Sequence, residues 1–129
     1  MKTKVMGAVA TLLTLSITTV AARDLTASEK KIVSDAVTRD FKDPASAMFR
    51  WLPIGDIPPD GQSYCGMVNG KNSYGAYNGY EPFLVFLLVK DKMLVSAMLL
   101  TMGNPSDSAS EQVTFETCQK NGQDPRAAK

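Results

Sequence analysis

The sequence predicts an α+β fold in which an N-terminal helix packs on a small antiparallel sheet of about four strands. Three observations favour this fold. Apolar residues recur at helical spacing over residues 25–41, and short apolar runs within residues 47–101 are separated by turn-forming residues. The chain also contains two cysteines, Cys65 and Cys118, which can pair into one disulfide.

Residues 1–22 have the features of an export signal. Lys2 and Lys4 supply positive charge, residues 5–20 carry none, and small side chains precede a cleavage point before Arg23. An uncleaved membrane anchor is the alternative, but a spanning helix needs about 20 predominantly apolar residues, and this run is shorter and rich in threonine and serine. We therefore expect cleavage of the signal peptide, no stable membrane span afterwards, and a periplasmic or secreted protein.

The mature chain is expected to form a single domain over residues 23–122, followed by a flexible tail over residues 123–129. Cleavage would remove two lysines and no acid, which leaves 12 basic and 13 acidic side chains. This near-neutral balance provides no basic surface for nucleic acid or for an anionic membrane. We expect neither as a partner.

The first helix is expected over residues 25–41. Thr26 or Ser28 can cap its start, and Glu29 places an acid in its first turn. The helix should end before Pro44, because the residue that precedes a proline disfavours the helical conformation. Its apolar positions form one stripe, made of Ile32, Val33, Ala36, Val37 and Phe41.

Four strand-like segments follow the helix. The first spans residues 47–52 and the second spans residues 64–69. Apolar runs at 83–89 and 93–101, joined by the charged residues 90–92, predict an antiparallel hairpin. Both runs are apolar at consecutive positions, so we expect them to be covered on both faces. An exposed second face would instead imply a homodimer interface, since a contiguous apolar patch rarely stays bare.

The segment 108–122 carries conflicting signals. Ser108 to Glu111 match a capping box, and Gly122 suits the position just after a helix. Residues 113–117 instead alternate and have a strand-like composition. The capping signals favour a helix, which we predict here.

We expect Cys65 and Cys118 to form a disulfide, because an isolated cysteine pair in an oxidising compartment is usually bonded. Such a bridge would close a loop of about 50 residues, for which the chain-entropy model gives roughly 4 kcal/mol of stabilisation. The alternative is two free thiols, one of them a nucleophile. A nucleophilic cysteine needs a base, and the chain contains no histidine.

The composition excludes most common catalytic chemistry. Without histidine the usual Ser-His and Cys-His pairs cannot form, and two widely spaced cysteines make no zinc pattern. The glycine motifs that bind phosphates and dinucleotides are absent. Carboxylates for sugar hydrolysis can be drawn from Asp56, Asp60 and Glu81, although no specific pair is indicated. We predict no catalytic residue, no metal site and no cofactor.

The segment 65–83 combines four glycines, three tyrosines and three asparagines with a single lysine. Glycine and asparagine favour tight turns, so the segment is either a structural corner or a recognition surface. As a recognition surface, the 69–80 loop would present four side chains and have Arg50 as a neighbour. The four are Lys71, Asn72, Tyr74 and Tyr77.

Simpler roles are also open to these residues. Lys71 can be a solvated lysine or can hold the turn by binding backbone carbonyls, as opposed to acting as a base or an anion contact. The aromatic residues recur every third position, and alternate members can be buried in the core while the others support turns. This series consists of Tyr74, Tyr77, Tyr80 and Phe83.

Two segments, Lys42–Arg50 and Cys65–Phe83, resemble the patterns KDPxSAxFR and CGxVNxKNxYGxYxGxxPF of a group of small uncharacterised exported bacterial proteins. The resemblance implies a bacterial periplasmic or secreted protein with one compact α+β domain, and it brings no activity with it. Gly70 departs from the alanine expected there. If Gly70 needs no positive φ, the turn there should be looser than in the relatives.

We expect a non-catalytic binding or envelope-associated protein whose ligand is an envelope component or another protein. One alternative is an enzyme that acts on an envelope polymer such as peptidoglycan, using Lys71 or an acid from residues 56–60. It would be favoured by a cleft that holds two titratable groups within hydrogen-bond reach. Another alternative is a secreted enzyme inhibitor, for which a rigid aromatic loop would be suited.

Overall fold

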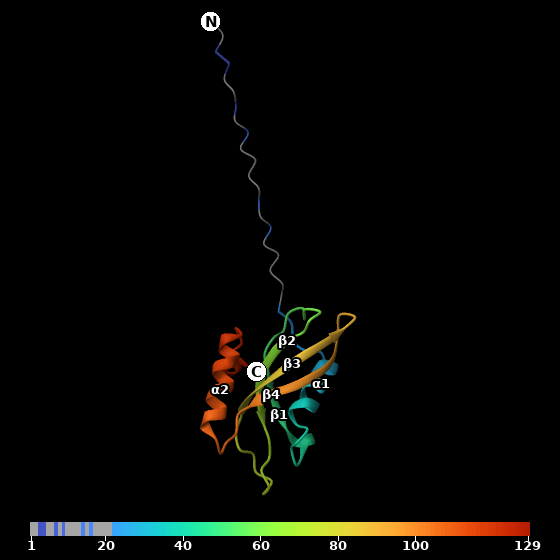
Figure 1. Ribbon diagram of the computed structural model, residues 1–129, viewed down its shortest axis with the longest axis vertical. Coiled ribbons are helices and arrows are strands. Elements are labelled where there is room, and N and C mark those ends of the chain that lie inside the picture. The colour runs from blue at the N-terminus through green and yellow to red at the C-terminus, as the bar shows by residue number, and fades with distance from the viewer. Residues whose placement is uncertain (1–2, 5–6, 8, 10–13, 15, 17–21) are drawn as a thin grey trace.

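The computed structural model describes residues 3–4, 7, 9, 14, 16 and 22–129. Most of the predicted signal peptide, residues 1–22, therefore lies outside the described residues. From Arg23 onwards the chain forms two α-helices and a four-stranded sheet, with two short 3-10 helices between and after them (Figure 1). The predicted α+β fold is confirmed.

The sheet is an antiparallel meander in which each strand pairs with the next one along the chain. Its strands, in both sequence and spatial order, are β1 (Met48–Trp51), β2 (Gln62–Asn69), β3 (Glu81–Lys90) and β4 (Met93–Met102). β3 and β4 form the predicted hairpin, and the turn residues Asp91 and Lys92 have φ of 52° and 63°. A two-residue turn of this hand matches the twist of the two strands.

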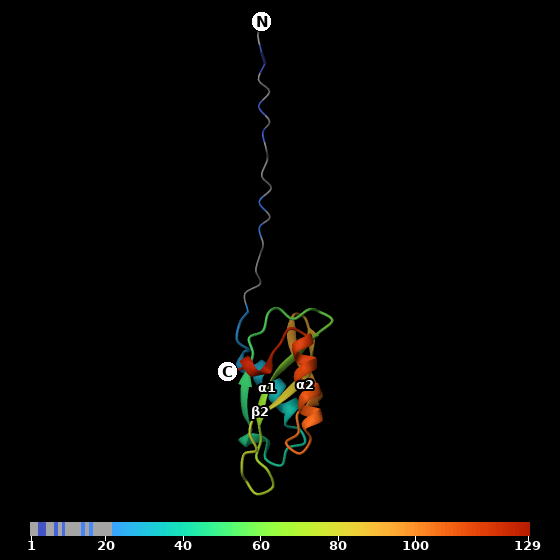
Figure 2. The same ribbon diagram turned by 90° about the vertical axis from the view of Figure 1, so that its left-hand side faces the viewer.

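α1 (Ala27–Val37) packs on one face of the sheet, where Val33 and Val37 are buried (Figures 1 and 2). The helix ends one turn before Phe41, so its predicted extent is too long. The chain turns at Thr38, whose carbonyl accepts a hydrogen bond from Phe41 N at 2.9 Å. This turn brings the Phe41 ring against Gly70, a contact that a continued helix would not allow. A short 3-10 helix, η1 (Pro44–Ser46), then leads into β1.

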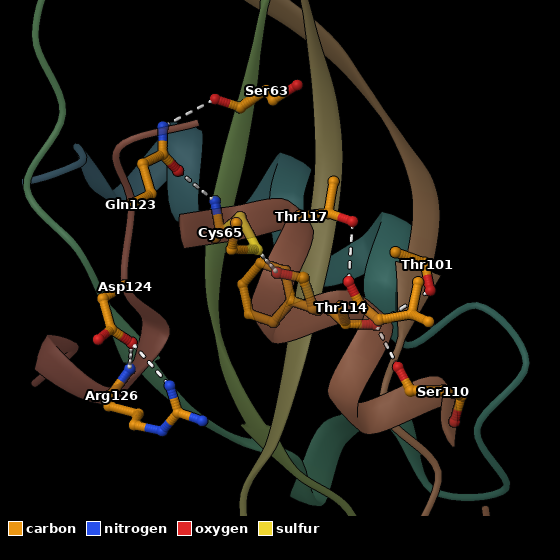
Figure 3. Close-up of a disulfide and its surroundings, with 12 residues drawn as sticks. Ser63, Cys65, Thr101, Ser110, Thr114, Thr117, Gln123, Asp124 and Arg126 are labelled. Atoms are coloured by element: carbon orange, nitrogen blue, oxygen red, sulfur yellow. Dashed lines mark hydrogen bonds and ion pairs between the residues drawn. A yellow bond between two sulfur atoms is a disulfide. The ribbon is translucent and has the colours of Figure 1, made fainter. Parts of the chain in front are cut away.

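α2 (Ser108–Lys120) covers part of the opposite face, and the helix predicted for this segment is confirmed (Figure 2). Its N-cap is Asp107 and not Ser108, since Asp107 Oδ1 accepts a hydrogen bond from Ala109 N at 3.0 Å. The threonines that suggested a strand fit the helix by bonding to its own carbonyls. Thr114 donates to the carbonyl of Ser110 at 2.8 Å (Figure 3).

A disulfide joins Cys65 of β2 to Cys118 of α2, as predicted (Figure 3). Both cysteines are fully buried, and their Cα atoms are 6.1 Å apart. The bond fixes α2 against the centre of the sheet and closes a long loop, which reduces the entropy of the unfolded chain.

The residues after α2 are ordered, so the predicted flexible tail over 123–129 is wrong. Gln123 Nε2 donates to the carbonyl of Ser63 at 3.0 Å, and Gln123 Oε1 accepts from Cys65 N at 2.7 Å (Figure 3). The register of β1 stops opposite Gly66, which leaves these two backbone groups of β2 without a strand partner. The glutamine amide supplies the missing partners, since buried backbone groups are rarely left unpaired.

A short 3-10 helix, η2 (Pro125–Ala127), continues this packing. Pro125 and Ala128 are buried. Lys129 then exchanges backbone hydrogen bonds with Trp51, at 2.8 and 3.0 Å. The C-terminal segment thus covers the part of the sheet that α2 does not reach on the side of β1.

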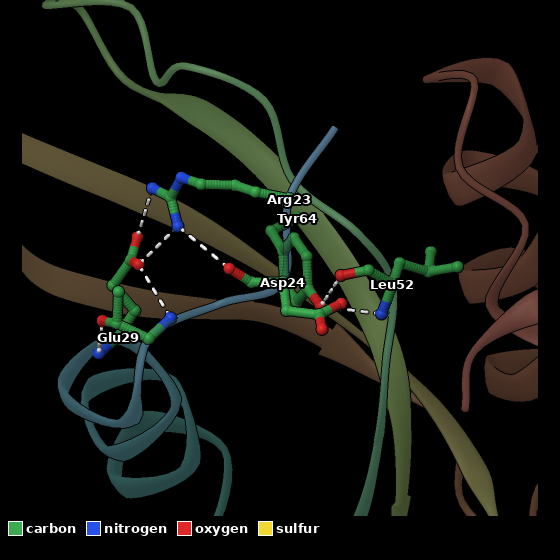
Figure 4. Close-up of polar contacts among 6 residues, drawn as sticks. Arg23, Asp24, Glu29, Leu52 and Tyr64 are labelled. Atoms are coloured by element: carbon green, nitrogen blue, oxygen red, sulfur yellow. Dashed lines mark hydrogen bonds and ion pairs between the residues drawn. The ribbon is translucent and has the colours of Figure 1, made fainter. Parts of the chain in front are cut away.

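The start of α1 is held by the carboxylate of Glu29, which binds Arg23 in two places at 2.7 and 3.0 Å (Figure 4). The same carboxylate accepts a hydrogen bond from Thr26 N at 3.0 Å, while Thr26 Oγ1 accepts one from Glu29 N at 3.2 Å. These reciprocal bonds form a capping box, with Thr26, one of the two caps expected, as the N-cap. The Arg23 hydrogen bonds, helped by the Thr26 bonds, lower the pKa of Glu29 to about 2.

A buried tyrosine ties the end of β1 to β2 close to this ion pair. The Tyr64 hydroxyl donates to the carbonyl of Leu52 at 2.8 Å and accepts from Leu52 N at 2.9 Å (Figure 4). Burial raises the pKa of Tyr64 above its usual value. The phenol satisfies both backbone groups of Leu52 within the core.

The prediction that both hairpin strands are covered on both faces holds for β3 from Phe83 to Leu87, fails at Leu88, and is wrong for β4. Phe83, Leu84, Val85 and Leu87 of β3 are buried. β4 is the edge strand of the sheet and has α1 on one face, but its other face is largely bare. The consecutive apolar residues of β4 did not reveal this difference, because their composition resembles that of β3.

Replacement of Gln123 with alanine should lower the free energy of unfolding by about 1–3 kcal/mol, because two buried backbone groups of β2 lose their partner. Thermal unfolding of the oxidised protein measures the effect. Gln119→Ala, at an exposed position of α2, is the matched control and should change stability by less than about 0.5 kcal/mol. Equal melting temperatures for the two variants would contradict a structural role for the C-terminal segment.

Glu29→Gln should destabilise the fold by about 1–2 kcal/mol at pH 7, since the charged partner of Arg23 is lost. The folded-state pKa of Glu29 lies below its ordinary value, so its contribution is fully present above about pH 4.5 and disappears as the pH falls through about 2. Urea unfolding at several pH values should show the two proteins converging at acidic pH. Asp35→Asn, which breaks an exposed ion pair with Lys31, should have little effect at any pH.

Candidate functional site

The loop between β2 and β3 projects beyond one end of the sheet (Figures 1 and 2). Gly75 and Gly79 in this loop have φ of 79° and 100°, which confirms the tight turns predicted from the composition. Gly70 does not have a positive φ, but a Cβ atom there would lie 2.8 Å from the Phe41 ring. Glycine at this position permits close packing, and the turn is not loosened by it.

Asn72 organises the tip of the loop. Its Oδ1 accepts hydrogen bonds from Tyr74 N at 2.9 Å and from Ala76 N at 3.1 Å, and its backbone N donates to the carbonyl of Ala76 at 2.7 Å. A side-chain oxygen that binds backbone two residues ahead is the mechanism by which asparagine stabilises turns. The Asn72 side chain, predicted to be presented to a partner, is therefore used inside the loop.

A second asparagine closes the base of the loop. Asn69, at the end of β2, is buried, and its Oδ1 accepts a hydrogen bond from Gly79 N at 3.0 Å. Asn78 N also donates to the carbonyl of Gly70 at 3.3 Å. With the base and the tip both fixed by asparagine side chains, the loop has a defined conformation despite its exposure.

Residues that precede β1 support the loop from the side. Lys42 Nζ donates to Ser73 Oγ at 2.7 Å, and the Tyr77 hydroxyl donates to the carbonyl of Ser46 at 2.7 Å. Sequence reasoning did not assign Lys42 and Ser46 to the site. Their position in Lys42–Arg50 could have pointed to them, because this segment and Cys65–Phe83 are the two that carry the resemblance. In the structure Lys42–Arg50 contacts the loop.

Arg50 lies beside the base of the 69–80 loop. Its guanidinium stacks on the ring of Tyr80, 3.9 Å from the ring centre, where the loop returns to β3. Lys71 Nζ lies 5.4 Å from the centre of the Tyr77 ring, and the two residues also form a backbone bridge across the loop. The structure thus brings Lys71 and Tyr77 together and places Arg50 beside the loop base.

Tyr74 occupies the tip and is 96% exposed. The aromatic series that begins with it becomes progressively buried toward the sheet: Tyr77 is 42% exposed, Tyr80 is half-buried, and Phe83 is fully buried. The alternation expected for a purely structural series is not observed. Tyr74 is the member whose aromatic ring is free to meet another molecule.

A hollow of about 490 Å³ lies beside the loop. It is bounded by the loop, by the turn after α1 and by the chain that follows β4, and both acidic and basic side chains line it. The charged residues in its wall are Asp40, Lys42, Lys71 and Glu81.

Glu81, in the wall of this hollow, has a carboxylate oxygen without a hydrogen-bond partner among the described residues. Its Oε2 is buried beside Gly103 and makes no hydrogen bond within the described part of the chain. Burial, with a smaller contribution from the negative charge of Glu111, raises the pKa of Glu81 above its usual value. No two titratable groups that line the hollow form an ion pair among the residues described.

The raised pKa of Glu81 predicts a stability that falls as the pH rises above about 4.5, because the folded state holds the proton more tightly than the unfolded chain. Glu81→Gln should remove this dependence and be as stable as the parent protein, or more stable by up to about 1 kcal/mol, at pH 7. Thermal melts from pH 4 to 8 measure this pH dependence of stability, and Asp60→Asn, at an exposed position, is the control. A clear loss of stability in the Gln variant at pH 7 would show that the ionised carboxylate has a favourable partner.

No helix within the described residues is long and apolar enough to cross a membrane, and those residues contain no cluster of three or more acidic or cysteine side chains that could hold a metal ion. Comparison of the chain with protein-family models, with curated proteins and with solved structures finds no match. The resemblance of the two segments to exported bacterial proteins stays a prediction, and the geometry of the loop is what supports a function.

Proposed function

We propose that this is an exported, non-catalytic binding protein that recognises a partner protein through the loop between β2 and β3. The observation that carries the proposal is the combination of a 96% exposed tyrosine, Tyr74, with a loop conformation fixed by hydrogen bonds. Tyrosine offers a large rigid contact area at a low cost in side-chain entropy. A loop that is already ordered loses little further entropy when it binds.

The partner best suited to this loop has a concave site that accepts an aromatic ring. Tyr74 projects from a narrow tip whose neighbours, Ser73 and Gly75, are small, so the ring can enter a pocket without obstruction. Lys71 and Lys42 add positive charge next to the tip. This arrangement favours a protein cleft with acidic groups at its rim.

Other features are compatible with export. The disulfide suits an extracellular or periplasmic protein. The enzyme alternative has less support, because Lys71 lies over an aromatic ring and has no acidic partner among the described residues. Catalysis by Lys71 or by Glu81 would need a second group within hydrogen-bond reach.

Tyr74→Ala should abolish partner binding and leave the melting temperature within about 2 °C of the parent protein, because the ring makes no packing contact to lose. The measurement is capture from the envelope fraction of the producing cell by the immobilised mature, oxidised protein. Gln119→Ala, at an exposed position on α2 outside the loop, is the control and should retain the partner. Retention of the same partner by Tyr74→Ala, or no specific partner for the parent protein, would overturn the proposal.

A further inference from the structure

A strip of apolar side chains is exposed along β4 and beside it. Met93, Val95, Met98 and Leu100 of β4 are each between 50% and 70% exposed. Leu88 of β3 is 42% exposed and Val113 of α2 is 55% exposed. We call these six residues the β4 strip. Apart from this strip, only Met48, Tyr74 and Tyr77 are large exposed apolar residues within 22–129.

The strip belongs to the face of the sheet that carries α2. Thr101 of β4 is hydrogen-bonded to Thr114 of α2 at 3.0 Å, which identifies that face (Figure 3). Met98 pairs with Phe86, and the pairing of Thr101 with Leu84 places Phe86 and Leu88 on the same face by alternation. Val95 and Leu100 fall at the two register shifts of the hairpin and have no partner on β3.

The strip is bare because too little chain covers this face. Neighbouring strands lie about 4.8 Å apart and a helix with its side chains is about 10 Å across, so one helix covers about two strands. The disulfide ties Cys118 of α2 to β2, α2 itself packs on β3 and on β4 near Thr101, and η2 packs on β2. The part of β4 before Thr101 is left uncovered beside α2, whose Val113 is also exposed.

The charges at the two ends of the strip differ in net sign. No charged residue occurs from Met93 to Ser106. Lys90, Asp91 and Lys92 lie at the start of β4 and carry a net charge of +1, whereas Asp107 and Glu111 lie at the start of α2, just beyond the end of β4, and carry −2. The uncharged strip is therefore bounded by one end of net positive charge and one end of net negative charge.

We propose that a second copy of this chain docks on the β4 strip through its own β4 strip, about a two-fold axis close to Met98. A two-fold axis places the same surface on both sides of the interface, and an axis perpendicular to β4 runs the two β4 strands in opposite directions. The positive end of each strip then faces the negative end of the other. α2 of each copy covers the bare part of β4 of its partner.

The charge pattern is the reason for naming a second copy as the occupant. The surface is complementary to itself, and the apolar centre can be buried without enclosing an unpaired charge. Exposed apolar patches above a few hundred Å² are rare on monomers and mark interfaces.

Sedimentation of the mature, oxidised protein from about 1 µM to 1 mM tests the proposal. We expect conversion from monomer to dimer across this range. Met98→Lys should weaken the dimer by at least tenfold. Met48→Lys, on the opposite edge of the sheet, is the matched control and should leave dimerisation unchanged, because Met48 is 40% exposed but lies outside the strip. Val113→Lys provides a second variant if Met98→Lys does not fold.

Mixing Met98→Lys with Met98→Glu distinguishes a second copy from a different occupant. The two axial residues face each other in the proposed dimer, so each variant alone should be monomeric and an equimolar mixture should regain a dimer. A parent protein that stays monomeric up to about 1 mM overturns the proposal. The proposal is also overturned if Met98→Lys and Met48→Lys weaken the dimer equally. It is overturned as well if the mixture of Met98→Lys and Met98→Glu remains monomeric.

Discussion

The covalent link between Cys65 on β2 and Cys118 on α2 holds the second helix over the centre of the sheet. From that position α2 ends where Gln123 can reach the unpaired backbone of β2, and the remaining residues continue to the edge of β1. The same placement leaves the outer face of β4 before Thr101 without a cover. The disulfide thus determines that the chain itself covers the β1 side of this sheet face and that the β4 side stays open to another molecule.

The second constraint is the contact between two segments far apart in sequence. The chain from Phe41 to Arg50 touches the loop between β2 and β3 through the packing of Phe41 on Gly70 and through the bonds of Lys42 and Ser46. These contacts join the segments Lys42–Arg50 and Cys65–Phe83 in space. They also stiffen the loop, which is what allows an exposed tyrosine at its tip to act as a rigid anchor.

The carboxylates of Glu29 and Glu81 have surroundings with opposite effects on the stability of the ionised form. Glu29 has a bidentate arginine and a backbone N–H, so its ionised form stabilises the start of α1. Glu81 has no partner for its buried oxygen, and its ionised form is disfavoured. The first arrangement is that of a structural ion pair. The second leaves an unsatisfied acceptor in the wall of the hollow beside the loop, at a cost to the stability of the fold.

Local patterns in the sequence determined the α+β class, the hairpin turn, the cap of α1, the presence of α2, the disulfide and the tight turns of the loop, because each depends on residues close together or on a pair with no competitor. Tertiary contacts decided the rest. α1 stops early because Phe41 packs on a loop that begins at Gly70. The polar C-terminal segment is ordered because Gln123 meets unpaired groups of β2, and most of the outer face of β4 is exposed because α2 is held over β3 and the end of β4 near Thr101. Of the predicted site residues, Asn72 is hydrogen-bonded to the backbone of the loop and Tyr74 is exposed to solvent. The sequence could not distinguish the two, because the hydrogen bonds of Asn72 exist only once the loop is closed.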